Sequence, residues 1–137
     1  MKMSFGMIFS IILIVIFVSF AFYAIKIFLN MNDTAQMGKF ASDLQADVES
    51  AWQASQSSQE KEYILPKKIE EVCFVDDDYE NLEFRATKKH FQGRKINYLD
   101  IPTTLGSEDE LCFENKDSKI TLTIKKSFGE SLVIIKK

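Results

Sequence analysis

The chain has 137 residues, 46% of them hydrophobic, with a formal net charge of −3 and an isoelectric point near 5.2. This acidic balance argues against nucleic acid as a partner, because binding to phosphates needs a basic surface. Two cysteines and one histidine are too few for the roughly four close ligands of a zinc site, so we expect no metal centre and no cofactor.

The first element is an uncharged apolar run from Met3 to Ile25. About 20 apolar residues in a helix match the thickness of the hydrocarbon core of a bilayer. The run is longer than the apolar core of a secretory signal peptide, which has about 7–15 residues. The end of the run, Phe22-Tyr23-Ala24, also lacks the small residue that a cleavage site needs three positions before the cut. We therefore predict a retained transmembrane helix over residues 1–29; the alternative is a buried helix of a soluble protein.

An amphipathic helix and a linker are predicted over residues 30–61. Met37, Phe40, Leu44 and Val48 recur at steps of three and four, which places them on one face of a helix that ends near Ser58. This stripe is expected to pack on the protein's own sheet, or else on neighbouring subunits. Asparagine, aspartate and threonine at 30–34 leave open whether the two helical segments are continuous. The polar run 53–60 has the composition of a linker.

Residues 62–137 change to a period of two, which predicts an antiparallel β domain. Short turn-like spacers separate the last three predicted strands, so these are expected to form a meander. The fold class is therefore α+β: a long N-terminal helix followed by a small sheet, with the amphipathic part of the helix across one face. The predicted extended segments are 62–65, 69–76, 82–87, 96–101 (the weakest), 110–114, 118–126 and 131–136.

Cys73 and Cys112 each lie in the middle of a predicted strand. They are either inert buried thiols in a reducing compartment or a disulfide in an oxidising one. A bond between them would close a loop of about 40 residues and contribute roughly 4 kcal/mol in the chain-entropy model. The positive charges of Lys2 and Lys26 on the two sides of the apolar run barely discriminate its orientation. The possible disulfide favours an oxidising compartment, so we expect the C-terminal domain to be extracellular.

Two charged clusters are candidate binding sites. Asp76, Asp77, Asp78 and Glu80 bring together the oxygen ligands that calcium prefers, but the spacing of an EF-hand is absent, so an acidic turn is expected. The basic cluster 88–95 is either a solvated loop or a contact for anionic headgroups or glycans. Its charged members are Lys88, Lys89, His90, Arg94 and Lys95.

Catalytic motifs are missing from the sequence. It contains no GxSxG, HExxH, CxxC or P-loop pattern. None of the nucleophile, metal-binding, redox or phosphate-binding motifs that these patterns mark can therefore be recognised in the sequence. We therefore expect no catalytic residues and a protein that is not an enzyme.

The order of these elements resembles that of a known superfamily. A short leader, a glycine, an apolar helix, an amphipathic continuation and a small β domain resemble type IV pilins and pseudopilins. The chain is more closely similar to small archaeal membrane proteins with class III-type signal segments. The residues that carry this second likeness are 39–44 (KFASDL) through Val48, Leu65-Pro66, 72–76 (VCFVD), and a second cysteine before 119–122 (KITL).

The resemblance implies a function and a set of partners. It implies processing between Gly6 and Met7, homo-oligomers formed through the N-terminal helix, and contacts with membrane lipid and with envelope or secretion-system proteins. We therefore expect a non-enzymatic structural subunit of a surface filament, such as a type IV pilus, or of an envelope assembly. The alternative is a single-pass membrane-anchored binding or accessory module within a larger complex.

Overall fold

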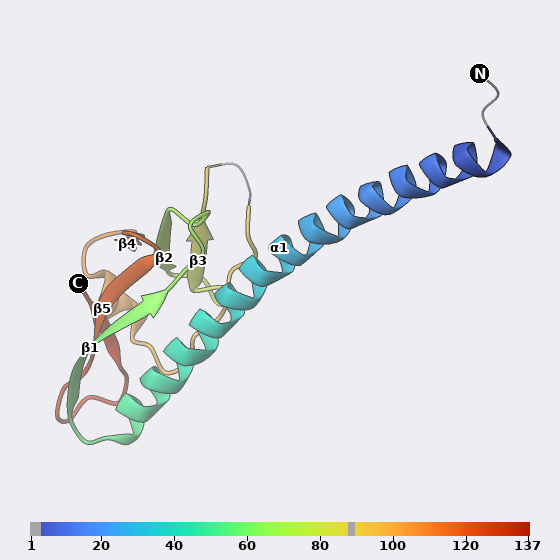
Figure 1. Ribbon diagram of the computed structural model, residues 1–137. Coiled ribbons are helices and arrows are strands. Elements are labelled where there is room, and N and C mark those ends of the chain that lie inside the picture. The colour runs from blue at the N-terminus through green and yellow to red at the C-terminus, as the bar shows by residue number, and fades with distance from the viewer. Residues whose placement is uncertain (1–3, 88–89) are drawn as a thin grey trace. The chain divides into compact units, whose positions relative to one another are not determined.

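A computed structural model describes residues 4–87 and 90–137 of the chain (Figure 1). It divides into two compact units, an N-terminal unit (Met1–Ala35) and a C-terminal unit (Gln36–Lys137). Helix α1 (Phe5–Gln53) contributes residues to both units, so the segment 30–34 is helical without a break. Sequence predictions that involve Lys2, Met3, Lys88 and Lys89 lie outside the described residues.

The described part of the N-terminal unit is almost entirely helical. The amide of Met7 donates a hydrogen bond to the carbonyl of Ser4 at 3.0 Å, where the helix begins. Farther along, the hydroxyls of Ser10 and Ser19 donate to carbonyls one turn earlier, each at 2.8 Å. Serine hydroxyls are commonly satisfied in this way inside apolar helices. These two polar side chains therefore need no partner outside the helix.

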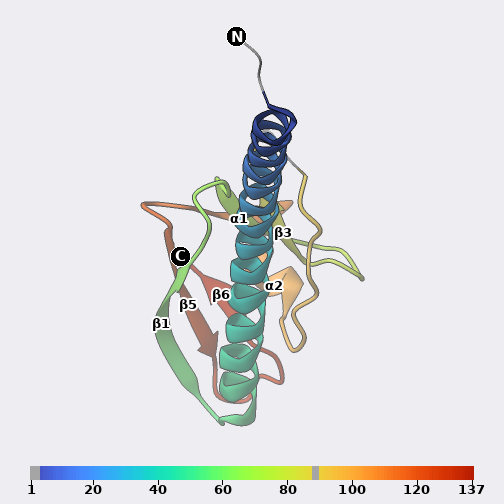
Figure 2. The same ribbon diagram turned by 45° about the vertical axis from the view of Figure 1, so that its right-hand side comes forward.

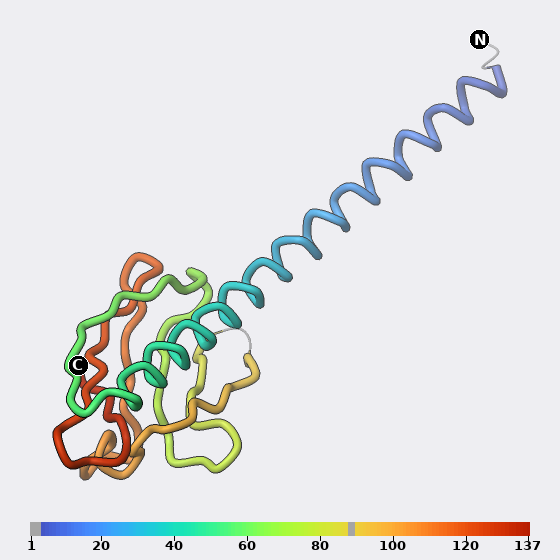
Figure 3. The backbone as a smooth tube through the Cα atoms, turned by 90° about the horizontal axis from the view of Figure 1, so that it is seen from below, coloured from blue at the N-terminus to red at the C-terminus, as the bar shows by residue number. Residues whose placement is uncertain are grey.

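In the C-terminal unit, α1 packs through the stripe of apolar residues that the sequence shows. Met37, Phe40, Leu44 and Val48 are each at most 5% exposed. Figure 3 shows these turns of the helix running alongside the strands. The helix ends at Gln53, earlier than the predicted Ser58.

Within residues 4–87 and 90–137, six strands form two antiparallel three-stranded sheets, so the α+β class is confirmed (Figures 1 and 2). The first sheet has the order β1-β5-β6 and the second has the order β3-β2-β4. The strand bounds are β1 (Ser57–Ile64), β2 (Glu71–Val75), β3 (Leu82–Arg85), β4 (Glu110–Glu114), β5 (Lys119–Lys126) and β6 (Ile134–Lys136).

The predicted meander of the last three strands is wrong in one of its two pairings. Strands β5 and β6 do pair, with Ile124 opposite Ile135. Strand β4 instead pairs with β2, and Cys112 lies opposite Cys73. Short spacers predict hairpins between neighbours in the sequence, but β4 instead pairs within the second sheet, where Phe113 is 5% exposed and meets Phe74 edge-on.

Two further segments differ from the prediction. The expected linker 53–60 overlaps the start of β1, which begins at Ser57 and pairs with β5 over its whole length. The weak strand predicted at 96–101 is absent, and residues Ile101–Leu105 instead form helix α2. Asp100 caps this helix by accepting a hydrogen bond from the amide of Thr103 at 3.2 Å, and Pro102 lies in its first turn. A capping aspartate before a proline is a helix-start signal that the prediction missed.

A segment without regular structure, residues 93–100, connects α1 with both sheets; we call it the crossing segment. The amide of Asn97 donates to Gln45 of α1 at 2.7 Å. The backbone of Ile96 makes two hydrogen bonds, each of 2.8 Å, with the side chain of the buried Asn81. Leu99 forms a bridge to Val133 beside β6. The crossing segment therefore fixes the position of α1 relative to the sheets within the C-terminal unit.

Candidate functional site

The most unusual surface of the described chain is the exposed apolar part of α1 between Phe5 and Met31. Its large apolar side chains range in exposure from 36% at Leu13 to 85% at Phe5. Soluble monomers rarely leave an apolar surface of this extent uncovered. We refer to residues 5–31 as the apolar segment.

The apolar segment meets the physical requirements for crossing a membrane. Among the described residues, α1 is the one helix that is long and apolar enough, and none of its most apolar window is buried. Residues 6–25 would span about 30 Å, the thickness of a hydrocarbon core. The helix also satisfies its own backbone hydrogen bonds, as a lipid environment requires. The segment is therefore compatible with membrane anchoring.

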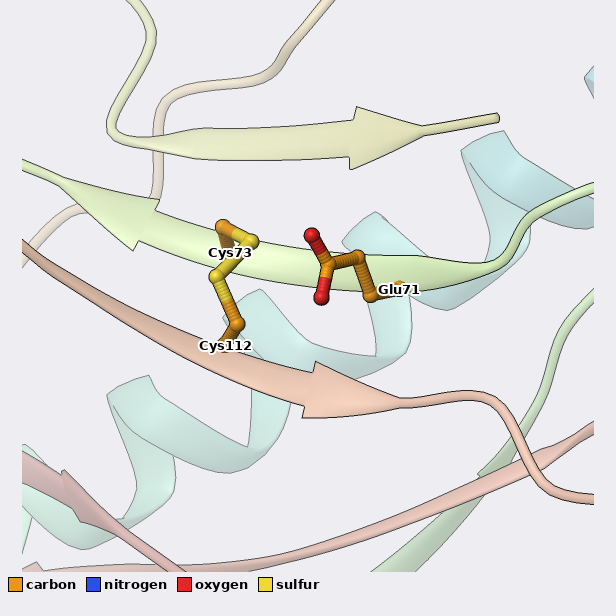
Figure 4. Close-up of side chains that lie close together, drawn as sticks. All are labelled: Glu71, Cys73 and Cys112. Carbon is orange, nitrogen blue, oxygen red and sulfur yellow. A yellow bond between two sulfur atoms is a disulfide. The ribbon is translucent and has the colours of Figure 1, made fainter. Parts of the chain in front are cut away.

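A disulfide lies on the outward face of the sheet β3-β2-β4. The sulfurs of Cys73 and Cys112 are bonded at 2.08 Å, and the two residues occupy directly opposite positions on β2 and β4. Figure 4 shows the carboxylate of Glu71 on the same side of the sheet as the two sulfurs. Val72 and Phe74 alternate with these residues and are buried in the core. Alternation along β2 thus places the disulfide opposite the hydrophobic core.

Arg85 of β3 is surrounded by carboxylates on this same face. Its guanidinium donates a bidentate pair of hydrogen bonds to the carboxylate of Glu110, and the bond from Nη1 is 3.0 Å long. It also lies 3.1 Å from Glu83 and 3.6 Å from Glu71. The hydrogen bonds from Arg85 lower the pKa of Glu110, and the same contacts raise the pKa of Arg85. We call Arg85 and these three glutamates the arginine cluster.

The arginine cluster could not be singled out from the sequence. Its glutamates and Arg85 alternate with core residues of three strands, of which β4 is distant in the sequence from β2 and β3. The signal available was the period of two, which places Glu83 and Arg85 on the face opposite Leu82 and Phe84. Which strands lie side by side could not be read from that period.

The disulfide face does not fit a metal ion. Glu71, Cys73 and Cys112 place their potential ligand atoms within 4.8 Å of one another. However, bonded sulfurs carry no thiolate to donate, and metal ligation by cysteine requires the thiolate. The guanidinium of Arg85 also lies close to Glu71, where its positive charge opposes a cation. The arrangement acts instead as a covalent and ionic connection between strands.

In the acidic turn after β2, the carboxylate of Asp77 accepts hydrogen bonds from the backbone of the turn itself. Asp77 accepts hydrogen bonds from the amides of Tyr79 and Glu80 at 2.7 and 2.9 Å. These bonds lower the pKa of Asp77. The nearby Lys95 donates to the carbonyl of Asp78 at 2.7 Å. The geometry is that of a turn stabilised by an aspartate, as the sequence interpretation expected.

The described members of the basic cluster do not converge on one site. The backbone of Arg94 pairs with that of Leu82, while the side chain of Lys95 donates a hydrogen bond to the acidic turn. His90 lines an open hollow of about 560 Å³ whose lining contains neither serine nor cysteine. Lys88 and Lys89 lie outside the described residues.

Trp52 has a structural role at the end of α1. It is partly buried and stacks on Tyr98 of the crossing segment, with ring centroids 4.0 Å apart. The aromatic face is thereby covered by the protein itself. Trp52 therefore acts as an anchor at the edge of the core.

No family model matches the chain, and searches of curated proteins and of solved structures find no match. The features of this chain that bear on its function are therefore the apolar segment and the chemistry of the disulfide face.

Proposed function

We propose that the protein is a non-enzymatic, pilin-like structural subunit of a surface filament or envelope assembly, anchored by a single membrane span. The observation that carries this proposal is the exposed apolar segment, which is continuous in sequence and in helix with the folded C-terminal unit. A segment of this composition needs a partner that removes it from water.

Lipid and neighbouring subunits can both provide that cover. Before assembly, the hydrocarbon core would solvate the side chains of the apolar segment. In a filament, the same side chains would pack against the helices of other copies. Because Ser10 and Ser19 bond to their own helix, neither environment leaves their hydroxyls unsatisfied.

The disulfide supports placing the C-terminal unit outside the cell. Disulfides persist in oxidising compartments and are rare in the cytosol. The bond joins Cys73 and Cys112 across a sequence separation of 39 residues. With the C-terminal unit outside, the amino terminus lies on the cytoplasmic side, and a single span suffices.

Electron microscopy of native cells with labelled protein tests the filament. The proposal expects labelled fibres from the wild-type chain and none from Ile16→Arg, because a charge at the centre of a span costs about 2.5–3.5 kcal/mol. Ile64→Arg is the matched control, since Ile64 is 65% exposed in the C-terminal unit. Uniform membrane labelling without fibres in the wild type would contradict the proposal.

A second candidate is a membrane-anchored accessory module in a larger envelope or secretion complex. One residue favours it: Ile11 occupies the fifth position counted from Met7, where pilins usually carry a glutamate that sets the register between subunits. Purification in mild detergent separates the two candidates. A defined stoichiometry with other proteins favours the module, whereas a homopolymer favours the filament.

A further inference from the structure

The two cysteines of the disulfide differ in their exposure to solvent. Cys73 is 0% exposed, whereas Cys112 is only partly buried. Cys112 also lines two neighbouring surface grooves of about 750 and 710 Å³. Cys73 lines neither of them. A molecule approaching this bond from solution therefore meets Cys112 first.

The order of the strands explains this difference. Cys73 lies on β2, the central strand of its sheet, while Cys112 lies on the edge strand β4. Arg85 projects from β3, on the far side of β2, and its Nη1 atom lies 3.9 Å from the sulfur of Cys112. The side chain of Arg85 thus extends across β2 toward β4. Its bonds to Glu110 hold the guanidinium there, beside the sulfur of Cys112.

We propose that Cys112 is a modification site, the sulfur at which small thiols enter by thiol–disulfide exchange, with Cys73 as the resolving cysteine. An incoming thiolate forms a bond to the sulfur of Cys112, and the bond between Cys112 and Cys73 breaks. The electron pair of that bond leaves on Cys73 as a thiolate. The products are a mixed disulfide on Cys112 and a free, buried Cys73.

The mixed disulfide can react further by either of two thiol–disulfide exchange steps. The thiolate of Cys73 can attack the sulfur of Cys112, expel the small thiolate and restore the original bond. A second small thiolate can instead attack the sulfur of the bound thiol, giving two free cysteines and an oxidised dimer of the small thiol. Both steps conserve atoms and electrons, and access decides which protein sulfur receives the first attack.

The carboxylates of this face do not distinguish the two sulfurs. A carboxylate oxygen of Glu71 lies within 4.8 Å of both, and Glu110 and Glu114 lie two residues on either side of Cys112. One of the grooves beside Cys112 is lined by Lys116, Lys119 and Lys137 as well as by acidic residues. These lysines can accommodate a small anionic thiol such as glutathione, and access decides which sulfur it attacks.

Peptide mapping of the wild-type full chain in detergent tests the proposal directly. The oxidised protein is incubated with reduced glutathione, quenched with acid, unfolded, and alkylated with N-ethylmaleimide under mildly acidic conditions. We expect glutathione on Cys112 and the maleimide on Cys73, with an excess of about tenfold or more over the reverse pattern. Equal labelling, a preference for Cys73, or no adduct at a glutathione concentration that modifies the unfolded chain would overturn the proposal.

Single-cysteine variants give an independent measure. Cys73→Ser leaves the thiol of Cys112, and Cys112→Ser leaves the thiol of Cys73. A chromogenic aromatic disulfide should react about 100-fold faster with the first protein than with the second, because a buried thiol reacts only when the structure opens. Equal rates in two folded variants would overturn the proposal. None of these outcomes depends on whether the chain forms filaments.

Discussion

The hydroxyl of Tyr63 donates a hydrogen bond of 2.6 Å to the carboxylate of Asp47, which joins β1 to α1. The ring of Tyr63 also meets Phe40 edge-on, with centroids 5.2 Å apart. Burial of Tyr63 and the nearby carboxylate of Asp47 raise the pKa of the tyrosine above its ordinary value. The hydroxyl therefore remains a protonated donor at neutral pH and beyond.

Replacing Tyr63 by phenylalanine removes this donor and keeps the ring. We expect the free energy of unfolding to fall by about 1 kcal/mol, the usual net value of one hydrogen bond, because Asp47 is partly exposed and can recruit water. Chemical denaturation of the full chain in detergent, followed by the fluorescence of Trp52, measures the change. Tyr79→Phe is the matched control, since Tyr79 is 83% exposed. A loss in the control as large as in Tyr63→Phe would contradict this account.

Lys126 of β5 serves as the cap of α1. Its ammonium donates to the carbonyl of Ala54 at 2.8 Å and also to the carbonyl of Trp52. These carbonyls lie at the negative end of the helix dipole, where a cation is favourable. Lys126→Met should therefore lower the unfolding free energy by about 1 kcal/mol. The neighbouring Lys125→Met should have little effect, and equal losses in both variants would argue against capping.

Gly93 is required by a close approach between backbone segments. A Cβ atom at this position would lie 2.7 Å from the carbonyl oxygen of Leu82. The backbone of Arg94 pairs with that same residue through two bonds of 2.9 Å. Gly93→Ala should thus destabilise the C-terminal unit by about 1–3 kcal/mol, as overpacking does.

Gly38 is the matched control for Gly93, because a Cβ atom added at Gly38 would meet no neighbouring atom. It lies within α1, and nothing is within 4 Å of the Cβ atom that alanine would add. Gly38→Ala should be neutral or slightly stabilising, because alanine favours the helix by up to about 1 kcal/mol. The contrast between the two variants, measured by thermal unfolding, separates the effect of contact from that of propensity. A stabilised Gly93→Ala protein would contradict the observed packing.

The arginine cluster predicts a pH dependence of stability. The pKa of Glu110 is lowered below its ordinary value of 4.5 by the hydrogen bonds from Arg85. Because the pKa of Glu110 is lower in the folded state than in the unfolded state, its pairing with Arg85 stabilises the protein fully at pH values above the ordinary pKa of 4.5. The contribution is lost as the pH falls through the pKa of the folded state.

The test compares Glu110→Gln with the wild type. The difference in melting temperature between the two proteins should be greatest at neutral pH and should disappear in acid. Glu114→Gln, a change of the same kind on β4, serves as the control. A difference that persists unchanged below the pKa of Glu110 would show that the pair does not act through its charge.

The sequence was sufficient to predict the elements that are defined by their own periodicity. The spacing of Met37, Phe40, Leu44 and Val48 defines the packed face of α1, because a helix has one period and one stripe. The alternation at 118–126 likewise predicts β5. These patterns depend on local geometry alone.

Pairing between distant strands could not be predicted in this way. Nothing in the residues 110–114 states that β2, rather than the neighbouring β5, is their partner. The same holds for Arg85, whose contacts with Glu110 and Cys112 come from the arrangement of three strands. Both results depend on which apolar faces the folded chain covers, and that is a property of the whole C-terminal unit.

The most direct test of the membrane anchor is alkaline carbonate extraction of membranes from cells that produce the full chain. We predict that the protein, with the apolar segment intact by mass spectrometry, stays in the membrane pellet and is released by detergent. Recovery of the chain in the alkaline supernatant as a freely dispersed monomer would contradict the account.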